Sequence, residues 1–331
     1  MRPEVLMYST DANLTYWDLK NLKSNDISIS ISDLQKTQDI FVQNNIQWVL
    51  MWEDSYHTKF HNIPNKPYIM YYIWDLSLLD KNILWIVWPR KPSDYSHRVL
   101  QRLFDYAKNY DLVTISGMAE WVDQLCHSFS VKYDIPTIAV LGWGIHHFLK
   151  GPQRHIVETI VSHWWLILSE FKIDFVPTKY SFPQRNRIVA GLCDRLFLPE
   201  AWIGSGSLIT ANFAYNLHKP VYSVPGDIFS PMEFWVNQLI HDKKASFITD
   251  FQLFFSQNFN LNSENQSNNI PVELSPQENQ ILSVLSSKWQ MSLDNLVHET
   301  NLDLDALMMN ITLLEMNDFV YQNIPGVYAV K

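Results

Sequence analysis

The chain has 331 residues, and 47% of them are hydrophobic, which is the composition of a globular protein rather than a disordered one. Its two cysteines, Cys126 and Cys193, lack metal-ligand spacing and are too few for a disulfide framework, so neither a structural zinc site nor disulfides are expected. No signal-like segment follows the N-terminus, and no apolar run reaches the roughly 18 residues of a membrane span, which predicts a cytoplasmic protein without membrane contact.

The net charge of −9 is unevenly distributed. Residues 75–255 contain 17 Lys and Arg against 17 Asp and Glu, whereas residues 256–331 contain 2 against 9. Lys and Arg supply most of the affinity for phosphate backbones, so an acidic chain binds nucleic acid only where its basic residues are grouped. The balanced central segment can still carry a local basic groove, whereas the acidic C-terminal segment is a poor phosphate site.

The first 75 residues have the least regular pattern. One helix is predicted from Leu34 to Asn44, and two apolar runs follow at residues 48–52 and 68–74. We assign residues 1–38 to a short N-terminal helical segment and residues 39–255 to the main domain.

Six short apolar runs recur from residue 83 onward, at 83–88, 112–116, 137–142, 164–169, 195–199 and 221–225. Segments with helical spacing lie between them, for example Val99 to Ala107 and Ile156 to Trp164. Apolar strands that alternate with helices are typical of an α/β fold, here a Rossmann-like doubly wound parallel sheet. Such sheets bind ligands outside the carboxyl ends of their strands, so the site is expected in the loops after these runs.

Residues 256–272 are rich in Asn, Gln and Ser, which predicts a flexible linker. Beyond it, Ser275, Pro276 and Glu278 form the start signal of a helix with a capping box. Apolar spacing predicts three helices and a terminal hairpin within residues 273–331, which together indicate a winged-helix domain.

The third predicted helix of this domain carries acidic residues and no Lys or Arg. Asp303, Asp305 and Glu315 lie on or beside it. A helix that enters the major groove must approach phosphates, so we predict that the winged helix contacts a protein rather than duplex DNA.

The segment Gly204-Ser205-Gly206-Ser207 directly follows a predicted strand and opens a predicted helix. Glycines let the backbone approach an anion closely, and the free N–H groups at a helix start favour a phosphate. An ordinary serine-capped helix after a tight turn gives the same pattern, so both interpretations stay open.

Two basic loops are expected at the same edge of the sheet. One follows the strand at 83–88 and contains Arg90 and Lys91. The other combines charged and aromatic groups, namely Lys179, Tyr180, Phe182, Arg185, Asn186 and Arg187. Arginines bind phosphates and rings stack on unpaired bases, a combination that favours single strands over duplexes. The alternatives are a solvated loop with its arginines paired to nearby aspartates and, for Phe182, a core ring.

Glu170 comes directly after a predicted strand. We interpret it as a structural residue, with the alternative that its carboxylate orients the arginines.

These segments resemble, in order and spacing, the successive motifs of the DprA/Smf family of DNA-processing proteins over about residues 40–255. The resemblance rests on SGMAEWVDQLCH (116–127), TIAVLGWGI (137–145), SFPQRNRIVAGLCD (181–194), GSGSLITANFA (204–214) and VYSVPGD (221–227). It implies a non-enzymatic homodimer without a cofactor. Such a protein binds single-stranded DNA (ssDNA) in a positively charged pocket, protects it and loads the RecA recombinase during natural transformation or recombination.

The same resemblance assigns binding roles residue by residue. The residues that it implies for ssDNA and phosphate binding are Arg90, Lys91, Ser116, Gly117, Lys179, Phe182, Arg185, Asn186, Arg187, Gly204, Ser205, Gly206 and Ser207.

The sequence departs from the family pattern where Trp88 and Trp121 stand in place of expected glycines. An indole at a turn that needs close backbone approach would narrow the pocket. This departure favours one rival interpretation, a protein-interaction module with a decayed DNA pocket. The other rival is a nucleotide or nucleoside-phosphate-processing enzyme of a related Rossmann variant, but no paired nucleophile and base can be recognised in the sequence.

Overall fold

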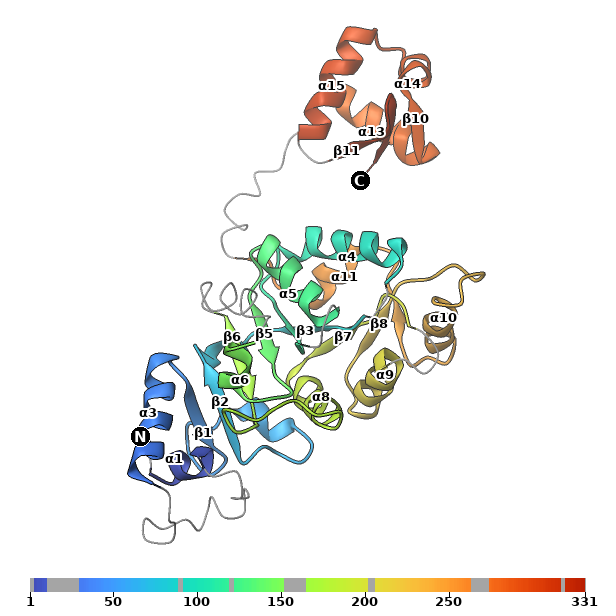
Figure 1. The fold of residues 1–331 in the computed structure, drawn as a ribbon. Coiled ribbons are helices and arrows are strands. Elements are labelled where there is room, and N and C mark those ends of the chain that lie inside the picture. Colours follow the sequence, from blue (N-terminus) through green and yellow to red (C-terminus); the bar gives the residue numbers. More distant parts are fainter. Residues whose placement is uncertain are drawn as a thin grey trace. The chain divides into compact units, whose positions relative to one another are not determined.

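The computed structural model describes residues 3–10, 30–88, 92–118, 122–151, 165–201, 206–262, 274–316 and 319–330. Contacts divide the chain into two compact units, Met1–Asn265 and Gln266–Lys331 (Figure 1). None of the helices within these described ranges has the length and apolar character needed to cross a membrane.

The first unit is built around a nine-stranded sheet in the order β1-β2-β6-β5-β4-β3-β7-β8-β9. The strands are β1 Gln47–Leu50, β2 Ile69–Ile73, β3 Ile83–Ile86, β4 Val113–Ser116, β5 Thr137–Val140, β6 Leu166–Ser169, β7 Arg195–Phe197, β8 Val221–Ser223 and β9 Ser246–Phe247. Strands β3 to β9 pair in parallel, whereas β2 is antiparallel to both of its neighbours. The predicted mixed α/β fold with a large, mostly parallel sheet is therefore confirmed.

Helices cover both faces of this sheet. They are α1 Pro3–Thr10, α3 Ile31–Gln43, α4 Asp94–Ala107, α5 Val122–Lys132, α6 Ile145–Leu149, α8 Ser181–Leu192, α9 Gly206–Asn216, α10 Phe234–His241 and α11 Phe251–Asn258, with the 3-10 helices η1 Thr58–Asn62 and η2 Leu76–Asp80. Figure 1 shows α4 and α5 on one side of the sheet and α8 and α9 on the other.

Strand β3 shows why a central strand can be apolar throughout. Trp85 packs in a cluster with residues of α8 and α9, whereas Leu84 and Ile86 pack in a cluster with residues of α4, α5 and α11. Successive residues of a strand point to opposite faces, so a strand covered on both faces buries every side chain.

All six apolar runs that predicted strands form strands, β3 to β8. The predicted helices at Val99 to Ala107 and Leu34 to Asn44 correspond to α4 and α3. The expected helix from Ile156 to Trp164 lies outside the described residues.

The ends of the main domain differ from the expected ones. Helix α3 crosses the boundary expected at residue 38. At the other end, α11 continues to Asn258, and Phe259 is buried in the same core as α4, so the first unit extends past residue 255.

The second unit contains α13 Pro276–Lys288, α14 Leu293–Thr300 and α15 Leu304–Met316, with β10 Gln290–Ser292, β11 Val320–Ile324 and β12 Val327–Val330 in the sheet order β10-β12-β11. The predicted capping box is present, because the Ser275 hydroxyl accepts a hydrogen bond from the Glu278 N–H and the Glu278 carboxylate accepts one from the Ser275 N–H. The three predicted helices and the terminal hairpin are found, and β10 is an additional strand.

Candidate nucleic-acid interface

The winding of the sheet reverses between β3 and β7, and the carboxyl ends of these two strands lie side by side. Glu200, which follows β7, is fully buried. Its carboxylate accepts hydrogen bonds from the N–H of Ser93 at 2.9 Å and from the Ser93 hydroxyl at 2.6 Å. Ser93 is also the N-cap of α4, so the segment after β3 is tied to the segment after β7 at the position where such sheets bind ligands.

Four of the predicted site residues stand in the sequence between β3 and Ser93 or shortly after Glu200. Arg90, Lys91, Gly204 and Ser205 lie outside the described residues. Gly206 is exposed as the first residue of α9, and a Cβ at its position would have no neighbour within 4 Å.

The guanidinium of Arg185 is buried, with 2% of the residue exposed. It donates to the backbone oxygen of Val140 at the end of β5, and its Nε donates to the side-chain oxygen of Asn186 at 3.1 Å. The same guanidinium fills the space beside Gly117, where a Cβ would overlap with it. Arg185 therefore brings a positive charge to the side of the sheet where the parallel strands have their carboxyl ends, which we call the carboxyl edge. It does so from inside the protein rather than from a solvated loop.

Arg187 forms a salt bridge with Glu170, and both side chains are mostly buried. The other terminal nitrogen of Arg187 donates to the backbone oxygen of Pro64 at 3.2 Å. Burial raises the pKa of the Glu170 carboxyl, and the charge of Arg187 opposes this effect. The salt bridge agrees with both interpretations of Glu170, since it is a buried structural contact that also fixes the orientation of Arg187.

Lys179 and Tyr180, which directly precede α8, are both exposed. Tyr180 is 71% exposed, and the Lys179 ammonium lies 5.0 Å from the centre of its ring. Gly142, just after β5, lies beside the backbone of Ser181, which places this pair at the carboxyl edge of the sheet. The pair offers a cation and an aromatic ring to solvent at one point.

Phe182 is half-buried and packs edge-on against Trp143, with 5.5 Å between ring centres. Asn186 is also half-buried, whereas Ser116 and Ser207 are buried. The alternative that Phe182 belongs to the core thus agrees with its packing. The sequence analysis named Tyr180 but did not include it among the predicted binding residues. Its position beside Lys179 in a polar segment is the feature that could have identified it.

Trp88 is a core residue. Its ring is 4% exposed and packs against His97 and Phe129 in the core beneath α4. The Trp88 side chain thus points inward, where it forms part of the core. Trp121 lies outside the described residues.

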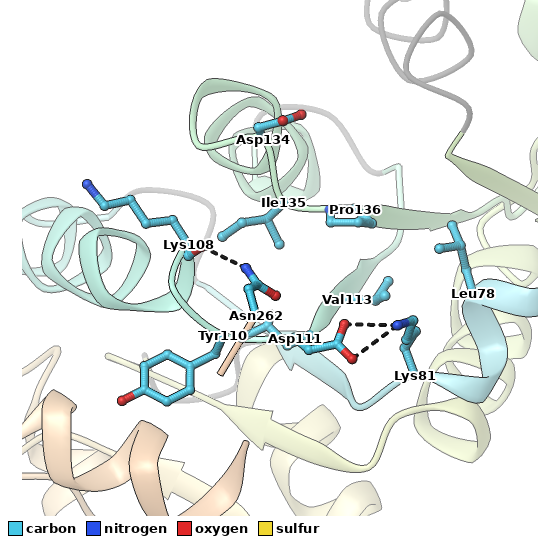
Figure 2. Close-up of a pocket in the computed structure, with 11 residues that line it drawn as sticks. Leu78, Lys81, Lys108, Tyr110, Asp111, Val113, Asp134, Ile135, Pro136 and Asn262 are labelled. Carbon is cyan, nitrogen blue, oxygen red and sulfur yellow. Dashed lines mark hydrogen bonds and ion pairs between the residues drawn. The ribbon is translucent and has the colours of Figure 1, made fainter. Parts of the chain in front are cut away.

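A separate hollow of about 100 Å³ opens where β4 and β5 begin, at the opposite edge of the sheet (Figure 2). Two of the charged residues that line it, Lys81 and Asp111, neutralise each other, because the Lys81 ammonium donates to both carboxylate oxygens of Asp111 at 3.1 and 3.0 Å. The Lys108 ammonium points away from the hollow. This arrangement has none of the convergent donors of a phosphate site.

In the part of the chain that the structure describes, no group of three or more His, Cys, Asp or Glu side chains is arranged to hold a metal ion. Cys126 and Cys193 are both buried thiols. His127 is instead engaged within the fold, with ring nitrogens 2.8 Å from the Thr137 hydroxyl and 2.8 Å from the Gly117 carbonyl oxygen.

The sequence is similar to those of several known DNA-processing proteins. It is 30% identical over 190 residues to DNA processing protein DprA of Streptococcus pneumoniae, an alignment that covers 67% of that protein and 57% of this chain. It is 30% identical over 218 residues to protein Smf of Synechocystis sp., with 54% of that protein and 65% of this chain covered. It is 32% identical over 171 residues to DprA of Bacillus subtilis, with 57% of that protein and 51% of this chain covered. The chain thus spans about two thirds of the first relative and little more than half of the other two.

Solved structures give the same result for the fold. The crystal structure of DprA from Streptococcus pneumoniae superposes with a TM-score of 0.59 and 25% identity, covering 92% of that protein and 78% of this chain. The structure of DNA processing protein A from Helicobacter pylori superposes with a TM-score of 0.55 and 28% identity, covering 95% of that protein and 64% of this chain. That structure describes the ssDNA binding mode of the Helicobacter pylori protein.

A family model described as DNA recombination-mediator protein A matches residues 47–258, which is most of the first unit and more than half of the chain. Relatives, fold and motifs therefore agree, and the chain belongs to the DNA recombination-mediator protein A family, which includes the DprA and Smf proteins.

Proposed function

We propose that this protein binds ssDNA at the carboxyl edge of its parallel sheet, protects it and delivers it to the RecA recombinase in transformation or recombination, without catalysing a reaction. Family membership supports a role in DNA processing, and the Helicobacter pylori relative binds ssDNA. The acidic net charge does not oppose this role, because binding depends on a local basic surface.

The observation that carries the proposal is the exposed pair of Lys179 and Tyr180 in front of α8. The Tyr180 ring can stack on a base while the Lys179 ammonium neutralises a neighbouring phosphate. Bases in a duplex are already stacked on each other, so this arrangement favours single strands. The dipole of helix α8, which begins directly after this pair, adds a modest attraction for anions.

The two buried arginines have a supporting role in this proposal. Arg185 and Arg187 hold α8 against β5, Glu170 and the segment around Pro64, and so fix the helix start that carries Lys179 and Tyr180. Arg90, Lys91 and the Gly204 to Ser207 segment would complete the phosphate contacts from the neighbouring loops that Glu200 and Ser93 connect.

For the rest of the molecule we infer a homodimer and a C-terminal winged helix that contacts a protein. The winged-helix assignment is supported by the order of the three helices and the hairpin in the second unit. The protein contact is supported by the excess of acidic residues in residues 256–331, with 2 basic against 9 acidic side chains.

The test is a titration of fluorescent oligo-dT of about 30 nucleotides, long enough for several binding footprints, at two salt concentrations with matched duplex as competitor. We expect the wild type to bind the single strand in preference to the duplex, and Lys179→Ala to weaken binding and reduce the salt slope by about one. Lys132→Ala is the matched control, because the Lys132 ammonium lies 5.2 Å from the Tyr133 ring near the opposite edge of the sheet. Absence of ssDNA binding by the wild type would refute the proposal.

Delivery to the recombinase needs a second measurement. The protein should accelerate RecA assembly on ssDNA, and Lys179→Ala should reduce this acceleration in proportion to its loss of DNA binding. If DNA binding occurs without any effect on RecA, the binding part of the proposal stands and the delivery part fails.

A further inference from the structure

Helix α15 of the second unit is apolar on two opposite sides. Leu307, Ile311 and Leu314 are buried and form part of the core of this unit. Four other large apolar side chains of the same helix are exposed, namely Leu304 (51%), Met308 (39%), Met309 (67%) and Leu313 (38%). At about 100° per residue, Met309 lies opposite the buried stripe, with Leu313 on one side of it and Asp305 and then Met308 on the other, whereas Leu304 lies beside the buried stripe. A soluble helix ordinarily turns such residues inward, so this outer face has the character of an interaction surface.

The outer face is acidic at both ends. Asp303 and Asp305 lie at the start of α15, Glu315 lies in its last turn, and all three are exposed. Residues 301–330 contain no Lys, Arg or His. In the described part of the second unit, the one ion pair joins Lys288 to Glu299, so these carboxylates have no internal cation.

This charge pattern discriminates among occupants. Duplex DNA would bring phosphates against the carboxylates, which repel them. A second copy packed across a two-fold axis would place Asp305 of one α15 against Glu315 of the other, so both ends of the contact would repel. A partner with basic groups at both ends and an apolar middle would instead be attracted everywhere.

We propose that the exposed face of α15 is a docking surface for a basic amphipathic helix of a partner protein. The apolar side of that helix would cover Met308, Met309 and Leu313, and its Lys or Arg residues would lie against Asp305 and Glu315. Helix-on-helix recognition of this kind uses apolar anchors three and four residues apart. Methionine side chains are flexible and polarisable, so the surface can adapt to more than one partner sequence. The proposal is independent of ssDNA binding by the first unit.

The probe is a fluorescent synthetic helix of about 18 residues, roughly five turns, with leucine on one side and lysine on the other. Its counterpart carries glutamate in place of lysine. Titrated with the full chain, the lysine peptide should bind and the glutamate peptide should not. Met309→Glu/Leu313→Glu should weaken binding of the lysine peptide by about tenfold or more, as expected for central anchors. Asp305→Asn/Glu315→Gln should weaken it less and reduce its dependence on salt.

The control is Ser286→Glu/Ser287→Glu, which adds the same charge at two exposed positions of α13. It should leave binding unchanged, and circular dichroism should show that all variants are folded. Equal binding by the wild type and Met309→Glu/Leu313→Glu would overturn the proposal, because the peptide would then be held by general acidity. So would a failure of the wild type to bind. Concentration-dependent self-association, or duplex binding, that is lost in Met309→Glu would also overturn it in favour of a second copy or DNA.

Discussion

The guanidinium of Arg185 occupies the space that any side chain on Gly117 would need. The two residues come from different elements, because Gly117 follows β4 and Arg185 belongs to α8. With Val140 at the end of β5, they join two strand ends to one helix.

This contact predicts that Gly117→Ala is destabilising. The added methyl group would displace a buried guanidinium and break its hydrogen bond to Val140, which corresponds to roughly 1 to 3 kcal/mol in the free energy of unfolding. Urea unfolding followed by circular dichroism measures this difference. The control is Gly206→Ala, since a Cβ there has no neighbour within 4 Å and alanine is the better helix former. Equal stability of the two variants would contradict the close packing at Gly117.

A second prediction concerns the pH dependence of stability through Glu170. Burial raises the pKa of this carboxyl above its ordinary value of 4.5, and Arg187 only partly opposes the shift. The folded protein then holds the Glu170 proton more tightly than the unfolded chain. The stability from this group is therefore fully present below about pH 4.5 and is lost as the pH rises through the raised pKa.

Glu170→Gln removes this titration. We expect the difference in unfolding free energy between the wild type and Glu170→Gln to shift in favour of the variant as the pH rises from about 4.5 toward 7. Unfolding by urea at a series of pH values tests this. Asp39, exposed on α3, provides the control substitution Asp39→Asn. A difference that is constant over the whole range would show that burial does not shift this pKa.

A third prediction separates stacking from charge in the proposed ssDNA site. Tyr180→Ala should weaken binding of oligo-dT by roughly 5- to 150-fold, because stacking of one base on an aromatic ring contributes about 1 to 3 kcal/mol. Tyr180→Phe should keep most of the affinity, and the salt slope should stay unchanged in both variants. Tyr215→Ala is the control, since this exposed ring lies in the last turn of α9, away from the carboxyl edge. Wild-type affinity of the Tyr180→Ala variant would show that the Tyr180 ring does not contribute to ssDNA binding.

A fourth prediction uses the two cysteines as reporters of folding. Cys126 and Cys193 are each no more than 1% exposed, and burial raises the pKa of the Cys193 thiol to about 12. The thiolate is the reactive form, so both thiols should react slowly with a disulfide reagent in the native protein and rapidly in urea. Fast reaction of either cysteine without denaturant would be inconsistent with the core beneath α4 and α8.

The sequence predicted the central strands well because each is buried on both faces and is therefore rich in apolar residues. Ile83 to Ile86 is a clear case, with all four residues buried. The short strand β9 could not be found this way, since Ser246 and Phe247 are both exposed and leave no apolar run.

The sequence could not predict which arginines are exposed. The polar segment around Arg185 and Arg187 predicts a loop with solvated cations, but it forms part of helix α8. The partners of the two arginines, Val140 and Pro64, are 45 and 123 residues away. Burial of a charge depends on such distant groups, and local spacing carries no information about them. The same reason explains Trp88, whose neighbours in the core come from α4 and α5.

The hydrogen bonds between Ser93 and Glu200 join residues 107 positions apart in the sequence. The two residues follow β3 and β7, which are neighbouring strands in the interior of the sheet rather than at its edge. Strand β3 pairs with β4 soon after it is made, but its other edge stays open until β7 has been synthesised. An apolar strand with an open edge invites pairing with another polypeptide. Closing so long a loop is also slow, because its entropy is lost before the strands pair. The connection beside the proposed DNA site is therefore completed late in folding, and nascent chains shorter than about 200 residues should be the most prone to aggregate.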